Sequence, residues 1–301
     1  MFRPLLSTSV LVAACLTLVL TVFPASAAPP ANPYFQRTWE RTDKPVADGK
    51  ANRTWMWGPE ARSGPLLEEY EESPASQRVV QYYDKSRMEI THPDGDPAVI
   101  WYVTNGLLSK EMIAGQMQTG DNTYVQRPPA EVNVAGDADD TTGPTYATFS
   151  SMLNLPAGQN GALVTQRVDR AGQVTDEPAL AAYGVTYGYR LTVPGIDHQV
   201  ASPFWEFMNS QALIYDREQF VEAPLFQNPF YATGYPITEP YWATVKVAGT
   251  HKDVLVQCFE RRCLTYTPDN PPGWQVEAGN VGQHYYTWRY ADSDPIPAPV
   301  G

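Results

Sequence analysis

Two segments of this chain, residues 79–91 and 255–267, align without a gap over thirteen positions. Three positions are identical and five more are close substitutions, such as Val for Leu and Asp for Glu. Each copy reads as an apolar strand, an acid–base turn and a return strand, followed by a Pro/Asp/Gly loop and a final apolar segment. A chain with such a repeat is expected to build two similar modules, which restricts its architecture strongly.

Short helices are expected around each copy. In the second copy, Val281, Tyr285 and Trp288 recur at the i, i+4, i+7 spacing of a helix face. In the first copy, Asp96-Pro97 is a good N-cap and first-turn pair for a helix in the segment 99–113. Upstream of the copies, the aromatic segments 35–41 and 204–209 also have helical character.

Proline and glycine limit the length of every element. The chain of 301 residues holds 28 Pro and 21 Gly, which excludes long helical bundles. The 36 aromatic residues (8 Trp, 18 Tyr and 10 Phe) exclude a disordered chain. We therefore predict a mainly β fold with short helices (α+β). Two hairpin-plus-helix modules, residues 32–118 and 197–291, flank a β-rich middle domain over 119–196, and 292–301 form a flexible tail.

The N-terminus indicates the compartment. Arg3 is followed by an apolar run and then by small residues, the pattern of a secretory signal peptide over residues 1–27. A lipobox-like sequence ending at Cys15 leaves a lipid anchor open as an alternative. No later stretch is apolar enough to span a membrane, and a net charge of −12 argues against nucleic-acid binding. We expect a secreted, possibly surface-associated monomer; neither the composition nor a motif implies a cofactor.

Two cysteines remain after the signal peptide, Cys258 and Cys263. In an exported protein such a pair usually forms a disulfide. A tight hairpin turning at Glu260-Arg261 would place the two cysteines directly opposite each other, at a spacing that a disulfide can bridge. In one straight strand they would point to opposite faces, so the pair favours the hairpin.

The second copy resembles the LGFP-type repeat of secreted bacterial proteins. The resemblance is carried by the aromatic segment Phe204–Asn209, the turn Gly234-Tyr235-Pro236, the hairpin Val256–Arg261 and the exit Tyr266-Thr267-Pro268. It covers residues 202–290 best and 35–113 less well, since Trp57-Gly58-Pro59 replaces Gly-Tyr-Pro in the first copy. The resemblance implies a module that contacts the cell envelope rather than a catalytic domain.

Aromatic residues at Pro/Gly turns are candidates for carbohydrate binding, because flat rings cover the apolar faces of sugars. The candidates are Trp55, Trp57, Tyr235, Tyr241 and Trp242. The alternative is that these rings form the core, as aromatic residues usually do in domains of short strands.

Candidate chemistry is sparse. The loop 136–143 carries carboxylates at spacings that suggest a calcium site at Asp137, Asp139 and Asp140, although Thr142 replaces the glycine of an EF-hand loop. The alternative is an exposed turn with solvated charges. Neither a metal-binding histidine motif nor a GxSxG elbow is present. We therefore predict no catalytic residues; Asp197, His198 and Ser202 are neighbours in sequence, which is poor support for a triad.

These observations predict a non-catalytic envelope protein that binds a wall polysaccharide or a surface partner through aromatic turns. The alternative is an extracellular hydrolase of glycan or peptide with paired carboxylates at a module junction. A cleft with a close carboxylate pair, one of them with a raised pKa, would favour the hydrolase. A shallow groove lined by aromatic rings would favour the binding protein.

Overall fold

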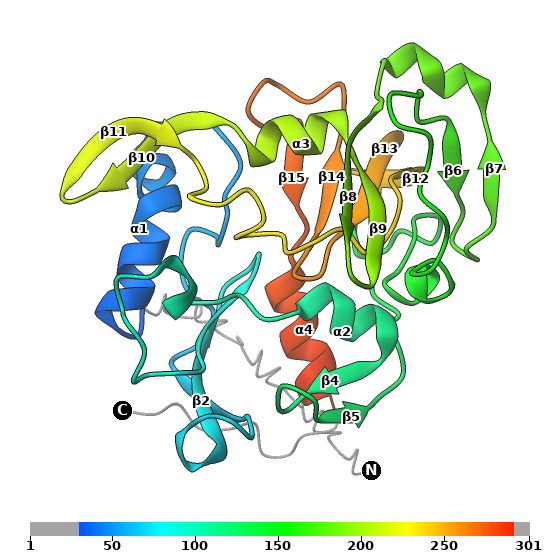
Figure 1. Cartoon of the computed structure of the whole chain (residues 1–301). Coiled ribbons are helices and arrows are strands. Elements are labelled where there is room, and N and C mark those ends of the chain that lie inside the picture. The colour runs from blue at the N-terminus through cyan, green and yellow to red at the C-terminus, as the bar shows by residue number, and fades with distance from the viewer. Residues whose placement is uncertain (1–29, 292–301) are drawn as a thin grey trace, which may run out of the picture.

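A computed structural model describes residues 30–291, which form a mainly β structure with short helices (Figure 1). The predicted signal peptide, Cys15 and the tail lie outside the described residues. Within residues 30–291, none of the helices has both the length and the apolar character needed to cross a bilayer. The predicted fold class is therefore confirmed.

The first half of the chain forms a small sheet, which one helix precedes and another follows in the sequence. Helix α1 (Pro33–Ala47) is capped by the side chain of Asn32 and has proline at its first position. A three-stranded antiparallel sheet follows, then α2 and a short hairpin. The bounds are β1 (Leu66–Glu69), β2 (Gln77–Tyr82), β3 (Arg87–Ile90), α2 (Leu108–Ala114), β4 (Gln116–Gln118) and β5 (Tyr124–Gln126).

The second half is built on a six-stranded sheet of order β15-β14-β13-β12-β6-β7. Strands β6 and β7 come from the segment 119–196, and β6 pairs with β12 in parallel where Arg167 faces Trp242. The middle of the chain thus shares a sheet with the C-terminal part. The strands are β6 (Gln166–Val168), β7 (Val174–Asp176), β12 (Tyr241–Val247), β13 (Thr250–Cys258), β14 (Cys263–Tyr266) and β15 (Val276–Ala278).

Two further hairpins and two helices complete the fold. Hairpin β8–β9 lies in front of the large sheet in Figure 1, and hairpin β10–β11 projects beside α1. Their bounds are β8 (Tyr187–Val193), β9 (Ile196–Ala201), α3 (Ser202–Met208), β10 (Gln211–Asp216), β11 (Gln219–Pro224) and α4 (Val281–Tyr290). Short 3-10 turns are η1 (Pro74–Ser76), η2 (Ile100–Tyr102), η3 (Ala147–Ser151) and η4 (Pro178–Tyr183).

The two aligned segments form hairpins of identical register. Val79 pairs with Ile90 in the first, and the aligned Leu255 pairs with Tyr266 in the second. At the end of the second hairpin, Cys258 lies opposite Cys263 with a Cα–Cα distance of 3.9 Å, and the two sulfurs are bonded. The predicted disulfide is therefore confirmed.

The identical glutamine of each copy performs the same structural task. Gln81 and Gln257 are both fully buried. The Oε1 of Gln81 accepts the backbone N–H of Ala31 at 2.7 Å, just before α1, and the Oε1 of Gln257 accepts that of Ala201 at 3.1 Å, just before α3. A buried side-chain amide without such partners would cost free energy, so each glutamine ties the start of a helix to its hairpin.

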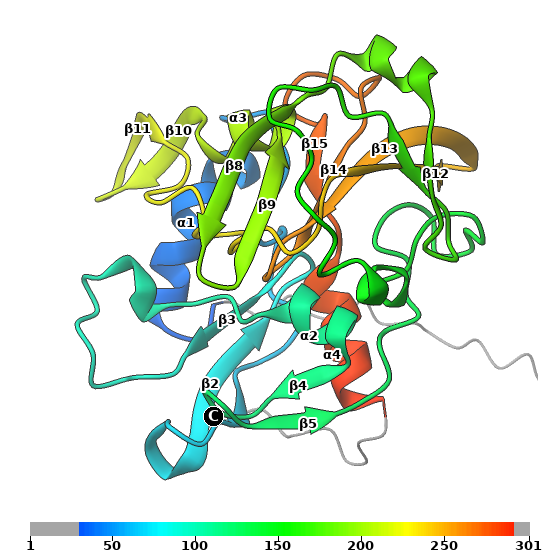
Figure 2. The same cartoon turned by 45° about the vertical axis from the view of Figure 1, so that its right-hand side comes forward.

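Each of the two helices that follow a hairpin packs on the turn of the other hairpin. Near the start of α2, the N–H of Lys110 donates to the carbonyl of Glu260 at 3.0 Å. Near the start of α4, the N–H of Gln283 donates to the carbonyl of Asp84 at 3.2 Å. The helices α2 and α4 lie side by side in both ribbon views (Figures 1 and 2). In this exchange of helices, each module places a helix on the hairpin turn of the other, and the two modules share one core.

A glycine makes the second of these contacts possible. A Cβ at Gly282 would lie 2.2 Å from the carbonyl oxygens of Tyr83 and Ser86. Because real Cβ atoms do not approach backbone oxygens so closely, only glycine lets α4 sit on the first hairpin turn.

Two local predictions were wrong. The expected helix over 99–113 is present only from Leu108, because the chain first forms the 3-10 turn η2 and then bends at Gly106, with φ of 70°. Within the middle domain over 119–196, which is predicted to be β-rich, residues 130–135 form no strand, although some of their backbone groups pair with residues 144–147. Proline at 128, 129 and 144 removes the N–H donors that a regular ladder needs there. The helix face of Val281, Tyr285 and Trp288 is buried as predicted.

Candidate functional site

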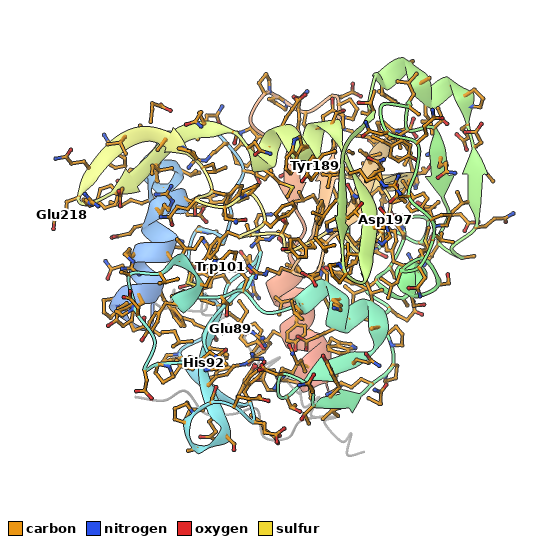
Figure 3. The ribbon with its side chains drawn as sticks, viewed as in Figure 1. Glu89, His92, Trp101, Tyr189, Asp197 and Glu218 are labelled. Atoms are coloured by element: carbon orange, nitrogen blue, oxygen red, sulfur yellow. A yellow bond between two sulfur atoms is a disulfide. The ribbon has the colours of Figure 1, made fainter. Side chains whose placement is uncertain are left out.

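A cleft of about 460 Å³ opens on the first module beside strand β3. It lies between β2–β3, the loop that leads into η2, and the hairpin β4–β5, with one residue from the second hairpin turn. Figure 3 shows Glu89, His92 and Trp101 gathered in this part of the molecule. The polar and aromatic lining residues are Tyr70, Arg78, Glu89, His92, Asp96, Trp101, Tyr102, Thr104, Gln118, Asp121 and Arg261.

The polar floor of the cleft is formed by Glu89 and Arg78, both of them buried. The Oε2 atom of Glu89 is 2.6 Å from Nη2 of Arg87 and 3.4 Å from Nη1 of Arg78. Its Oε1 atom accepts a hydrogen bond from the hydroxyl of Thr104 at 3.0 Å. Burial acts to raise the pKa of Glu89, but the positive charges of Arg78 and Arg87 outweigh it and lower the pKa. Glu89 is therefore a fixed anion at neutral pH.

A buried ion-pair network supports this floor from behind. Arg87 bridges Glu89 and Glu68, with 2.8 Å between Nη1 and Oε2 of Glu68. Glu68 also lies 3.3 Å from Nε of Arg289, on α4, and accepts hydrogen bonds from the hydroxyls of Tyr82 and Tyr290. Despite its burial, these cations and hydroxyls lower the pKa of Glu68 to about 2. Each charge of the floor thus lies within 4.0 Å of two opposite charges: Arg78 is near Glu68 and Glu89, and Glu89 is near Arg78 and Arg87.

The aromatic side of the cleft is dominated by Trp101 on η2, with 41% of its surface exposed. The centroid of its ring lies 5.5 Å from the ring centroid of Tyr231 and 5.3 Å from the Cζ atom of Arg261. The hydroxyl of Tyr231 donates to the carbonyl of Val103 at 2.7 Å, which fixes this side of η2. The indole is thus held from one side and open to solvent on the rest of its surface.

The five rings predicted to bind a ligand are not brought together. Trp57, Tyr241 and Trp242 are at most 2% exposed, so the expectation that they stand at the surface was wrong. They pack in the core, where the indole N–H of Trp242 donates to the carbonyl of Val164 at 2.8 Å. Trp55 is half-buried. Tyr235 is 37% exposed on the Gly-Tyr-Pro turn and does not line the cleft.

Sequence reasoning missed Trp101 as a candidate. A signal was present, because the residue follows the Pro/Asp/Gly loop of the first copy, where a ring can be displayed. Asp96-Pro97 instead predicts a helix in the segment 99–113, and this prediction does not single out Trp101 as an exposed ring.

A second hollow, of about 670 Å³, lies on the other side of the same segment. Ala98, Ile100 and Val103 line this hollow, whereas Val99, Trp101 and Tyr102 line the cleft. Its floor consists of core residues, including Trp57, and its rim is formed by α1 and the tip of hairpin β10–β11 around Glu218 (Figure 3).

The acidic loop 136–143 anchors the turn between β12 and β13. Asp137 accepts the N–H groups of Ala248 and Gly249, and Asp139 forms an ion pair with Lys246 at 2.6 Å. Asp140 accepts the N–H groups of Thr142, Gly143 and Lys246. These carboxylates are occupied by donors of the protein, and residues 30–291 contain no cluster of three or more acidic, His or Cys side chains suited to a metal ion.

Asp197, His198 and Ser202 have separate partners. Asp197, which is labelled in Figure 3, forms an exposed ion pair with Arg190 on the neighbouring strand. The Nδ1 atom of His198 lies 3.1 Å from Glu239 instead. The hydroxyl of Ser202 accepts the N–H of Thr186. The arrangement is that of structural contacts between strands.

Comparison of the chain with protein-family models, with curated protein sequences and with solved structures gives no match.

Proposed function

We propose that this protein binds a carbohydrate in the cleft at Trp101 and does not cleave it. The observation that carries the proposal is the exposed indole of Trp101 in the same cleft as a buried pair of opposite charges, Arg78 and Glu89. An exposed ring offers an apolar face to a sugar. Adjacent guanidinium and carboxylate groups offer donors and acceptors together, which is what neighbouring sugar hydroxyls require.

The electrostatics of the cleft favour binding over hydrolysis. A glycosidase needs a carboxylic acid whose pKa is raised so that it can donate a proton. Glu89 has a lowered pKa and stays ionised. Burial does raise the pKa of Glu111, but this residue is 2% exposed and lies outside the set that lines the cleft. The buried carboxylate of the cleft is therefore suited to accept hydrogen bonds rather than to donate a proton.

We further propose that the protein acts outside the cell, at the envelope. The signal-peptide pattern of residues 1–27 and the resemblance of 202–290 to LGFP-type repeats support this location. The carbohydrate would then be a wall polysaccharide or the glycan part of peptidoglycan.

A sedimentation assay tests the proposal. The purified mature protein is mixed with insoluble peptidoglycan or with wall polysaccharide, and the supernatant is assayed for protein and for newly released reducing ends. We expect the protein to sediment without sugar release, and Trp101→Ala to weaken binding about tenfold or more. Tyr183→Ala is the matched control, since Tyr183 is 38% exposed but does not line the cleft.

The outcomes separate the functions. Release of reducing ends would support a hydrolase and refute the proposal. Binding that Trp101→Ala and Tyr183→Ala reduce equally would place the carbohydrate site elsewhere.

A further inference from the structure

The cation that completes the cleft comes from the other module. Arg261 lies in the turn of the second hairpin, half-buried, with its guanidinium carbon 5.3 Å from the ring centroid of Trp101. It lines the cleft together with Trp101 and Arg78. Its backbone N–H donates to the carbonyl of Thr233 at 2.8 Å, and its Nη1 donates to the carbonyl of Tyr231.

Arg261 forms no ion pair with any residue in the part of the chain that the structure describes. The carboxylates that influence it electrostatically are Glu89 and Glu260. Glu89 is paired with Arg87 and Arg78, and Glu260 is paired with Lys110 at 3.6 Å. Arg261 therefore contributes a positive charge without a counterion of its own.

The remaining charged groups of the cleft do not neutralise it. Asp121 accepts the hydroxyl of Tyr70 at 2.7 Å, and Asp96 accepts the N–H of Ala98 at 2.9 Å; both residues are exposed, so water screens their charges. Holding a half-buried cation without an anion costs free energy, and burial lowers the pKa of Arg261 accordingly. An anion that docks beside Trp101 would gain a charge-assisted hydrogen bond at an already positioned donor.

We propose that the saccharide bound in this cleft carries a carboxylate, which Arg261 binds while the sugar ring contacts Trp101. The inference rests on the proposed function and names the class of its ligand, an acidic saccharide. One uncompensated guanidinium matches the single charge and the planar shape of a carboxylate. Arg261 is thus the residue that determines specificity.

Calorimetry with two matched probes tests this inference. One probe is the tetramer of N-acetylglucosamine, which is neutral, and the other is the peptide-free tetrasaccharide that alternates N-acetylglucosamine with N-acetylmuramic acid. We expect the wild-type protein to bind the acidic probe about tenfold more tightly, the typical effect of one charge-assisted hydrogen bond. Arg261→Gln should abolish this preference by weakening binding of the acidic probe about tenfold more than binding of the neutral probe, whereas Arg261→Lys should retain part of the preference.

The matched control is Arg62→Gln, because Arg62 is an exposed cation of the first module that pairs with Asp84 and does not line the cleft. Its preference for the acidic probe should equal that of the wild type. Increasing salt should weaken binding of the acidic probe alone, which tests the charge without any substitution if a variant folds poorly. Equal affinity for the two probes, or a preference that survives Arg261→Gln, would overturn the acidic-ligand inference and leave carbohydrate binding intact.

If neither tetrasaccharide binds, the proposed function fails for these glycans, and the anion site is tested separately. Glucuronate is titrated while the indole N–H signal of Trp101 is followed by NMR. A shift in the wild type that is absent in Arg261→Gln supports an anion site at this position. No shift in the wild type refutes it.

Discussion

Tyr82 lies directly opposite Arg87 across the first hairpin, with the guanidinium carbon 5.8 Å from the ring centroid. The aligned positions of the second hairpin are Cys258 and Cys263, joined by the disulfide. The same cross-strand position is therefore closed by a covalent bond in one module and by an arginine–aromatic contact in the other. The arginine of the first module, Arg87, also pairs with Glu89 in the floor of the cleft.

Loss of the disulfide should lower the free energy of unfolding by about 2 kcal/mol, the value expected from chain entropy for so short a loop. The double substitution Cys258→Ser with Cys263→Ser tests this in urea unfolding experiments. Reducing agent should destabilise the wild type by the same amount and leave the double variant unaffected. An unchanged midpoint in both would show that the hydrogen bonds of the turn suffice.

Removing Arg87 should be far more damaging. Arg87→Ala leaves Glu68 and Glu89 buried with fewer cations, and breaking a buried ion pair in this way costs about 3–5 kcal/mol. Arg62→Ala, in the exposed pair with Asp84, should cost less than about 1 kcal/mol. Thermal unfolding of both variants provides the comparison, and similar losses would contradict a buried, tightly coupled network.

His284 should make stability depend on pH between about 6.5 and 4. Burial, together with the charge of Lys85, lowers its pKa to about 4, and its Nδ1 lies 3.1 Å from the hydroxyl of Tyr146. The unfolded chain takes up this proton first as the pH falls, so the folded state loses stability below pH 6.5, by up to about 3 kcal/mol. His284→Gln should remove that component from urea midpoints measured at pH 7.5, 5.5 and 4.5. An unaltered pH profile would assign the dependence to other groups.

Gly282→Ala should disturb the contact between α4 and the first hairpin turn. The new methyl group would overlap the carbonyl oxygens of Tyr83 and Ser86, so we expect a loss of about 3 kcal/mol, despite the better helix propensity of alanine. Thr287→Ala, on the exposed side of the same helix, is the control and should have little effect. Gly282→Ala as stable as the control would show that α4 can shift without loss.

The hairpins could be predicted from the sequence because their determinants are local. A disulfide between Cys258 and Cys263 requires these two residues to lie opposite each other, which sets the register of the second hairpin. The alignment of the two segments then predicts that Tyr82 lies opposite Arg87 in the first hairpin. The cleft could not be predicted in this way. Trp101 is displayed because Arg261 and Tyr231, both far away in sequence, support it from one side.

Tertiary packing buries most of the other aromatic rings that the sequence offers as binding candidates. Trp57 and Trp242 lie beside turn residues in the sequence, yet both are buried in the core by tertiary packing. Composition shows that a chain is rich in aromatic residues, but only the arrangement of distant elements decides which ring faces water.

The exchange of helices between the modules has a consequence for the order in which the chain can fold. The turn at Asp84 contacts residues 57–62 of its own module, but it also needs α4, the last described element to be synthesised, because the N–H of Gln283 donates to its carbonyl. The first hairpin therefore stays partly uncovered until nearly the whole chain has been synthesised. Contacts between such distant segments slow folding, and a chain shortened before residue 281 would leave both halves incomplete.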